Sequence, residues 1–388
     1  MSGRVPSAAA GPAGGFEPPV YPYERLAGAR EKADAHPGGV VDLSIGTPTD
    51  PTPPAVVAAL STSGAEAGYP MSVGSGRYRE AAAGWMARRL GVEVDPAGVC
   101  ACVGTKEFVS TLPHWLRLRS PERDTVLHPA VAYPSYAMGA TLAGCRAVPV
   151  PVDDRWRLDL SAVDPADARR ALLLWVNSPG NPAGQLDDLE AAAEWGRSWG
   201  VPVFSDECYV EYTWDGPRRS VLGAGPDGVV AVHSLSKRSN AAGLRAGFYA
   251  GDAELVRYLS EVRKHVGLLV PGPVQAAAAV ALDDDAHVDA QRLVYRRRLD
   301  WFAALLRALG VEVALPGGGF YLWAPAPGGD AWGFTERLAA DAGCLVSPGD
   351  LYGEAGAGWV RIALVRPIER LELVARRLGV DVPGPPAP

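Results

Sequence analysis

The stretch ALLLWVNSPGNPAG, residues 171–184, joins a short apolar run to a turn rich in proline, glycine and asparagine. The apolar part, residues 171–176, has the length of a buried strand, and a helical pattern from about 186 to 199 follows it and ends at Gly200. A second apolar run, residues 201–205, comes next. This order of strand, helix and strand predicts a βαβ unit with two parallel strands.

Polar side chains follow this strand and the next two along the chain. Asn181 lies in the turn after the first, the cluster from Asp206 to Tyr209 follows the second, and the apolar run 229–232 leads into His233-Ser-Leu-Ser-Lys237. The carboxyl ends of strands in an open α/β sheet meet at one edge, which is where ligands bind. The sequence therefore predicts one site built from these strand ends.

The rest of the chain continues this alternation and predicts an α/β fold. We expect a mostly parallel central sheet in a large domain, with helices on both faces, and a smaller α+β domain. The apolar spacing over 288–309 predicts one long helix, and a final helix is expected around 368–378. The predicted divisions are a disordered tail (1–20), an N-terminal segment that packs with the small domain (21–50), the large domain (51–287), the small C-terminal domain (288–381) and a second tail (382–388).

Composition restricts the class of function. The 388 residues are 48% hydrophobic and carry a net charge of −7 without a long basic run, which argues against nucleic acid or an anionic membrane as the main partner. No apolar stretch reaches the roughly 18 residues of a membrane span, and no secretory signal segment is evident, so we expect a cytoplasmic protein. Five scattered cysteines fit neither a disulfide framework nor a zinc site, and no metal is predicted.

Only four of the 37 basic residues are lysines, so a reaction that needs a primary amine has four candidates: Lys32, Lys106, Lys237 and Lys264. Lys237 ends an apolar strand, and Arg245 follows eight residues later. Burial and a cationic neighbour both lower the pKa of a lysine and free its amine for Schiff-base formation. Taken alone, a lysine in this position is more often a solvated loop residue.

Two features near Lys237 suit a phosphate group. Ser234 offers a hydroxyl and Arg245 a rigid guanidinium fork. The turn Gly104-Thr-Lys106 offers backbone amides and a hydroxyl that could open a helix on the same anion, although such a turn alone is usually a helix cap.

Asp206 follows an apolar strand, where a carboxylate needs a cation or strong hydrogen bonds to stay ionised. A protonated pyridine nitrogen would be such a partner, and an internal ion pair or a helix cap is the alternative. Asn181 and Tyr209 each offer a donor for an oxygen on such a ring. Considered separately, they are a turn residue and a core residue.

The order of Asn181, Asp206, Tyr209, Ser234, Lys237 and Arg245 on strand ends of one sheet resembles the class I and II aminotransferases, the fold type I family that depends on pyridoxal phosphate. The resemblance covers residues 21–380. It implies that Lys237 binds the cofactor covalently and shuttles the proton between the substrate α-carbon and the cofactor. It also implies that Asp206 keeps the ring nitrogen protonated, and that Asn181 and Tyr209 contact the ring hydroxyl oxygen.

The same resemblance assigns the remaining site residues. It places Tyr133 on the ring, and it implies a phosphate site of Gly104, Thr105, Lys106, Ser234 and Arg245. Tyr69 resembles the tyrosine that reaches the phosphate of a neighbouring subunit, which implies a homodimer with shared active sites. Gly46 belongs to a loop that closes over the substrate, and Arg361 would take the α-carboxylate bidentately, with Asn181 beside it.

A narrower resemblance is to the actinobacterial succinyldiaminopimelate aminotransferases, and its motifs lie at residues 41–48, 232–240, 262–266, 270–275 and 284–288. It implies amino exchange between N-succinyl-LL-2,6-diaminopimelate and 2-oxoglutarate. Departures from the pattern at Arg77-Tyr78, Ala183 and the glycines 317–319 concern the substrate more than the cofactor. For the distal end of a dicarboxylate substrate, the candidates are Lys264, Arg263 and Arg77.

Two alternatives stay open, and the sequence argues against a third. An aminotransferase of the same subgroup with another amino acid substrate, and a lyase or decarboxylase on the same fold, would share all these motifs. A transcription regulator with an aminotransferase-like domain is not expected, because only about 20 residues precede the predicted body.

Overall fold

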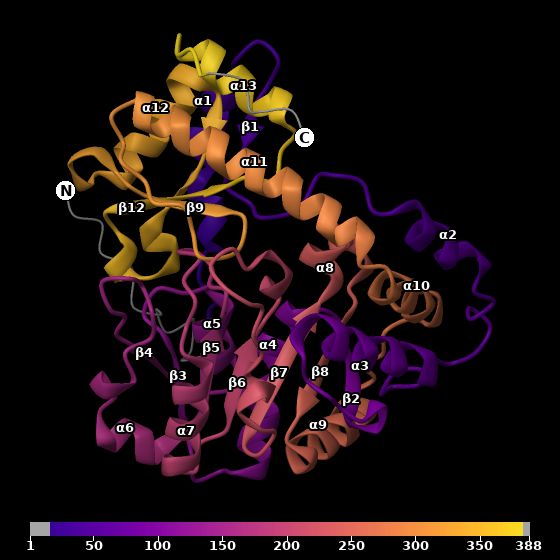
Figure 1. Ribbon diagram of the computed structural model, residues 1–388. Helices are drawn as coiled ribbons and strands as arrows, with labels where there is room; N and C mark the ends of the chain where they lie inside the picture. The colour runs from indigo at the N-terminus through magenta and orange to yellow at the C-terminus, as the bar shows by residue number, and fades with distance from the viewer. Residues whose placement is uncertain (1–15, 383–388) are drawn as a thin grey trace.

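The computed structural model describes residues 16–382. Most of the predicted N-terminal tail, residues 1–15, and nearly all of the C-terminal tail, residues 383–388, therefore lie outside the described residues. Figure 1 shows a larger part built around a central sheet and a smaller part that contains the C-terminal helices.

The central sheet has seven strands in the order β2-β8-β7-β6-β5-β3-β4. Their bounds are β2 Val99–Cys102, β3 Thr125–Pro129, β4 Arg146–Val150, β5 Ala171–Asn177, β6 Val203–Asp206, β7 Val229–Ser234 and β8 Gly247–Gly251. Only β8 runs antiparallel to its neighbours in this sheet. The predicted α/β fold with a mostly parallel sheet is confirmed.

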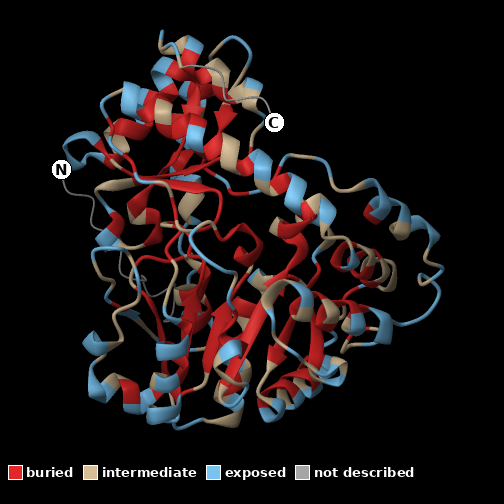
Figure 2. Cartoon of the chain, viewed as in Figure 1, coloured by how far each residue is buried: buried red, intermediate tan, exposed pale blue. Residues whose placement is uncertain are grey.

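The register brings the expected polar residues to one edge. Asn177 is paired with Asp206, and Asp206 with Val232, so the carboxyl ends of β5, β6 and β7 lie side by side. These strands are buried on both faces, as Figure 2 shows in red, because they form the centre of the sheet.

Helices cover both faces of the sheet. Leu174 and Val176 of β5 belong to one core cluster, while Leu173 and Trp175 belong to another, as expected when alternate side chains point to opposite faces. The helices of this part are α2 Pro54–Thr62, α3 Gly76–Leu90, α4 Thr105–Arg119, α5 Ser135–Leu142, α6 Pro165–Arg170, α7 Leu189–Trp199, α8 Leu235–Arg238, α9 Ala253–Val266 and α10 Gly272–Asp283.

Two predicted boundaries differ from the structure. Helix α7 begins at Leu189, three residues later than the apolar pattern suggested, because the Asp188 side chain caps it by accepting a hydrogen bond from the Ala191 amide. Strand β6 begins at Val203 instead of 201. The helix expected over 288–309 is α11, Ala286–Ala308, and the final helix is α13, Ile368–Arg377.

The smaller part combines an antiparallel sheet with helices. Strands β9 Tyr321–Pro325, β11 Ser347–Pro348 and β12 Trp359–Ala363 form the order β11-β12-β9, and the remaining helices are α1 Ala27–Asp34 and α12 Ala331–Ala342. Strand β1 (Val41–Asp42) pairs in parallel with β10 (Cys344–Leu345). Because residues near 41 share this core, we propose the division into a small domain that includes the segment 21–50 and a large domain over 51–287.

Across residues 16–382, every helix is too short or too polar to cross a lipid bilayer.

Candidate active site

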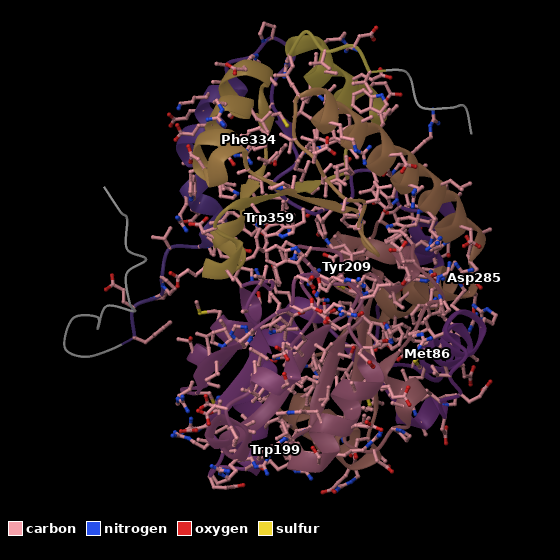
Figure 3. All side chains as sticks on the ribbon, turned by 60° about the vertical axis from the view of Figure 1, so that its left-hand side comes forward. Met86, Trp199, Tyr209, Asp285, Phe334 and Trp359 are labelled. Carbon is pink, nitrogen blue, oxygen red and sulfur yellow. The ribbon has the colours of Figure 1, made fainter. Side chains whose placement is uncertain are left out.

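A cavity of about 400 Å³ lies at the carboxyl ends of β5, β6 and β7, and side chains of the small part close its other side. Figure 3 labels Tyr209, which lies between the two parts of the molecule. Eleven of the thirteen residues proposed from sequence line this cavity: Gly46, Thr105, Lys106, Tyr133, Asn181, Asp206, Tyr209, Ser234, Lys237, Arg245 and Arg361.

The other two predicted residues lie outside the cavity lining. Gly104 precedes α4 with a positive φ of 77°, and a Cβ at this position would overlap the Arg245 guanidinium. The absence of a side chain at Gly104 therefore leaves room for the Arg245 guanidinium at the start of α4. Tyr69 is 100% exposed in the single chain and contacts no part of its own cavity.

Lys237 lies on the short helix α8, directly after β7, and its Nζ donates a hydrogen bond to the carbonyl oxygen of Gly46. Burial, together with the positive charges of Arg361 and Arg245, lowers the pKa of Lys237 to about 8. Near neutral pH the neutral, nucleophilic form of this amine is therefore far more populated than in an ordinary lysine, whose pKa is 10.5.

Asp206 ends β6 and is 6% exposed. Its Oδ2 accepts a hydrogen bond from the Tyr136 hydroxyl at 3.1 Å, and its Oδ1 accepts one from the Cys208 amide at 3.2 Å. Burial raises the pKa of this carboxyl, although the two donors and Lys237 oppose the effect. Among residues 16–382 Asp206 forms no ion pair, so a cation on a ligand would favour its ionised form.

Arg361 lies on β12 and is 1% exposed. Its Nη1 donates to Asn181 Oδ1 at 2.8 Å, its Nη2 donates to the Ser44 carbonyl oxygen, and its Nε has no partner among the described residues. The guanidinium lies over the Tyr321 ring, 4.4 Å from its centroid. A buried guanidinium without a carboxylate partner in the described chain is suited to bind an anion from the cavity.

The phosphate candidates gather at the start of α4. Thr105 opens this helix, whose N-cap residue Gly104 has no capping side chain, and the first amides of a helix have no partner within the helix. Arg245 Nη2 reaches the Val103 carbonyl oxygen at 3.3 Å. Lys106 is placed differently from expectation, because its Nζ donates to the Tyr21 hydroxyl at 3.0 Å, towards the mouth of the cavity.

Sequence reasoning missed several residues of the lining, namely Tyr21, Tyr23, Ile45, Tyr136, Cys208 and Tyr321. Tyr136 belongs to the same short segment as Tyr133, which was the available signal. Tyr321 follows the glycine run 317–319 that the sequence marked as unusual.

The prediction for the distal end of the substrate is wrong for Arg263. This side chain is buried and forms a bidentate ion pair with Glu107, at 2.6 and 2.8 Å, so its charge is already neutralised. Arg77 pairs with Asp283, and Lys264 lies on the surface near Glu261. Neither of these lines the cavity of its own chain.

The mostly parallel sheet, with a lysine and a carboxylate facing one cavity at its carboxyl edge, defines an enzyme of fold type I. Residues 38–378 match the model of the family described as aminotransferase class I and II, and the chain belongs to this family.

Three similar proteins illustrate the range of the family. The 4-dedimethylamino-4-oxo-anhydrotetracycline transaminase OxyQ of Streptomyces rimosus is 43% identical, over 93% of this chain and 99% of that protein. The LL-diaminopimelate aminotransferase of Desulforudis audaxviator is 36% identical, over 93% and 95% of the two chains. A structure of a probable N-succinyldiaminopimelate aminotransferase from Thermus thermophilus has a TM-score of 0.84 at 33% identity and covers 92% of this chain and 98% of that one.

Pyridoxal phosphate is the cofactor of this family, and the charges of the cavity fit it. The lining holds four cationic side chains (Lys106, Lys237, Arg245 and Arg361) but one carboxylate, Asp206. This excess of positive charge matches a ligand with a phosphate and a substrate with a carboxylate, while Asp206 matches a protonated ring nitrogen.

The lowered pKa of Lys237 has a measurable consequence. Only the neutral amine attacks an aldehyde, so the rate at which the cofactor-free enzyme takes up pyridoxal phosphate should rise with pH to a midpoint near 8. Below this pH the ammonium form dominates and uptake slows. Stopped-flow absorbance measures the rate, and a blocked lysine derivative with its ordinary pKa is the reference. A midpoint equal to that of the reference would contradict the lowered pKa.

Proposed function

We propose that this aminotransferase takes the amino group of N-succinyl-LL-2,6-diaminopimelate and passes it to 2-oxoglutarate. One observation carries the proposal: Arg361, which has no carboxylate partner in the described chain, lies in the same cavity as Lys237. A further cation, Lys106, lies at the mouth of this cavity. An α-carboxylate at Arg361 and an acidic distal end near Lys106 account for both charges.

In this proposal, Lys237 and Asp206 carry the proton chemistry. Pyridoxal phosphate, when bound, withdraws electrons from the substrate α-carbon and makes its proton acidic. The Nζ of Lys237 takes this proton and would deliver it to the cofactor carbon that receives the amino group, and in the second half of the reaction it would move a proton in the opposite direction. The Asp206 carboxylate holds a proton on the ring nitrogen.

The other side chains orient the reactants. Asn181, Tyr209 and Tyr133 line the cavity. Asn181 and Tyr209 would contact the ring hydroxyl oxygen, and Tyr133 would pack on the ring. The backbone amides of Thr105 and Lys106 at the start of α4, together with Ser234 and Arg245, would hold the phosphate group. Gly46 and its loop cover the substrate. Fixing two reactants in this way replaces an encounter from solution with a step inside one complex.

Tyr69 supports a homodimer with shared active sites. Tyr69 and Met71 lie on the same loop and are 100% and 58% exposed in the single chain. A pair of large apolar side chains at one exposed loop is typical of a surface that a partner covers. We therefore propose that Tyr69 reaches the phosphate site of a second copy.

The aromatic mouth of the cavity favours a second candidate substrate. Tyr21, Tyr23 and Tyr133 line it together with Ile45, and these side chains suit a flat apolar ligand. The 43% identity to OxyQ supports amino transfer to a cyclic ketone.

A donor titration tests the substrate proposal. Each candidate donor is added to the loaded enzyme, and the loss of aldehyde-form absorbance is followed as donor concentration rises. We expect N-succinyl-LL-2,6-diaminopimelate to reach half-conversion at a concentration at least about tenfold below that of alanine, since one good charged contact is worth about 1.4 kcal/mol or more. Equal values for both donors, or a preference for LL-diaminopimelate or an aminated polycycle, would contradict it.

A further inference from the structure

Tyr321 connects the two halves of the cavity. It begins β9, is 1% exposed and lines the cavity. Its hydroxyl lies 2.7 Å from the Tyr209 hydroxyl, and its ring supports the Arg361 guanidinium from 4.4 Å. One side chain therefore contacts a residue proposed for the cofactor and a residue proposed for the substrate.

The position of this hydroxyl is tightly defined. A Cβ on Gly46 would overlap the Tyr321 hydroxyl, so the loop that carries Gly46 packs directly against it. The Phe320 and Tyr209 rings also lie against Tyr321, with centroids at 4.9 and 5.5 Å. Among the described residues, Tyr209 is the one hydrogen-bond partner of this hydroxyl.

The count of protons fixes the direction of the bond between the two tyrosines. Each hydroxyl has one hydrogen to donate and two lone pairs. If Tyr209 gives its hydrogen to the ring oxygen of the cofactor, it has none left for Tyr321. Tyr321 must then donate to Tyr209, and hydrogen bonds in such a chain strengthen one another.

We propose that Tyr321 is a positioning residue of the amino-transfer reaction, whose hydroxyl donates to Tyr209 Oη and thereby aims the Tyr209 proton at the cofactor ring oxygen, while its ring holds Arg361 for the substrate carboxylate. This inference rests on the proposed roles of Tyr209 and Arg361. Burial raises the pKa of Tyr321 to about 12, so the hydroxyl keeps its proton at working pH.

Two substitutions separate the hydroxyl from the ring. Tyr321→Phe keeps the ring under Arg361 and removes only the donor. Without it, Tyr209 stabilises the ionised ring oxygen less well, so the pH midpoint of the absorbance change of the loaded enzyme should rise by about 0.5 to 1 unit. The KM for the amino donor should stay within about twofold.

Tyr321→Leu also removes the ring. The same rise in midpoint is expected, and KM should increase by a further factor of about 3 to 20, which corresponds to one lost cation–π contact. Tyr249→Phe is the matched control, since Tyr249 is equally buried on β8 and lies outside the cavity lining. This control should leave both the midpoint and KM unchanged.

The outcomes distinguish this inference from the proposed function. If the absorbance change of loaded Tyr321→Phe has the same pH midpoint as that of the wild type, the proposed role of the hydroxyl is overturned. A KM for Tyr321→Leu equal to that of Tyr321→Phe would overturn the role of the ring. A wild-type protein that binds the cofactor but converts no amino donor would instead remove the proposed function.

Discussion

Replacing Lys237 with alanine is expected to lower the rate of amino transfer by at least about 10⁴-fold, the upper end of what a single acid–base group contributes. The loss is this large because Lys237 has two roles in the proposed reaction. Its Nζ lies in the cavity near Asp206 and binds the cofactor covalently, and the same Nζ also moves the α-proton. The exposed Lys106 donates to Tyr21 at the mouth and is not placed to replace it.

The Lys237→Ala protein should remain folded. Burial disfavours the charged form of Lys237 and lowers its pKa from 10.5 to about 8. Below pH 8 the buried ammonium group therefore reduces the free energy of unfolding of the cofactor-free wild type, and alanine removes this penalty. The Tm of the cofactor-free variant should therefore equal or exceed that of the wild type at pH 7. Lys264→Ala is the control, because Lys264 lies on the surface near Glu261, and it should retain full activity. Normal turnover by Lys237→Ala would refute the assignment.

The sequence predicted the sheet because local patterns determine it. Short apolar runs such as residues 171–176 and 229–232 can be buried on both faces only in a covered parallel sheet. The polar residues directly after these strands share an edge by topology alone. For this reason the same cavity contains Asn181, Asp206, Tyr209, Ser234 and Lys237.

Contacts between distant segments were beyond local patterns. Arg263 and Glu107 form an ion pair although 156 positions separate them, and the motif around Arg263 does not predict an internal partner. Tyr209 and Tyr321 are 112 positions apart and come from the two different parts of the molecule. The first pair depends on how α9 lies beside α4 within the large part, and the second on how the small part sits on the large one; periodicity encodes neither.

The second large effect is expected for Asp206→Asn, which should reduce kcat/KM by about 10²- to 10⁴-fold. Removing one partner of a buried charge pair costs roughly 3–5 kcal/mol, and each 1.36 kcal/mol is tenfold in rate. An amide cannot balance a positive charge on the ring nitrogen. It also places an NH₂ group where Asp206 now accepts from the Tyr136 hydroxyl or the Cys208 amide.

Glu207→Gln provides the matched control. Glu207 is the next residue, is 1% exposed, and lies outside the cavity lining, with its Oε2 3.5 Å from His233 Nε2. Loss of this neighbouring buried carboxylate should change kcat/KM by only a few-fold. A similar loss in both variants would show that general electrostatics of the strand end, and not the contact of Asp206 with the ring, governs the rate.

A chemically altered cofactor separates charge from structure in Asp206→Asn. Pyridoxal phosphate methylated at the ring nitrogen keeps its positive charge without a carboxylate, so it no longer needs Asp206 to hold a proton there. The difference in kcat/KM between wild type and Asp206→Asn should therefore narrow with the methylated cofactor. If misplacement of Tyr136 or Cys208 caused the loss, the difference would persist, because their contacts with residue 206 do not depend on the methyl group. The loss of kcat/KM caused by Asp206→Asn is thus measured with the natural and with the methylated cofactor. The ratio of these two losses shows how much of the contribution of Asp206 comes from stabilising the positive charge on the ring.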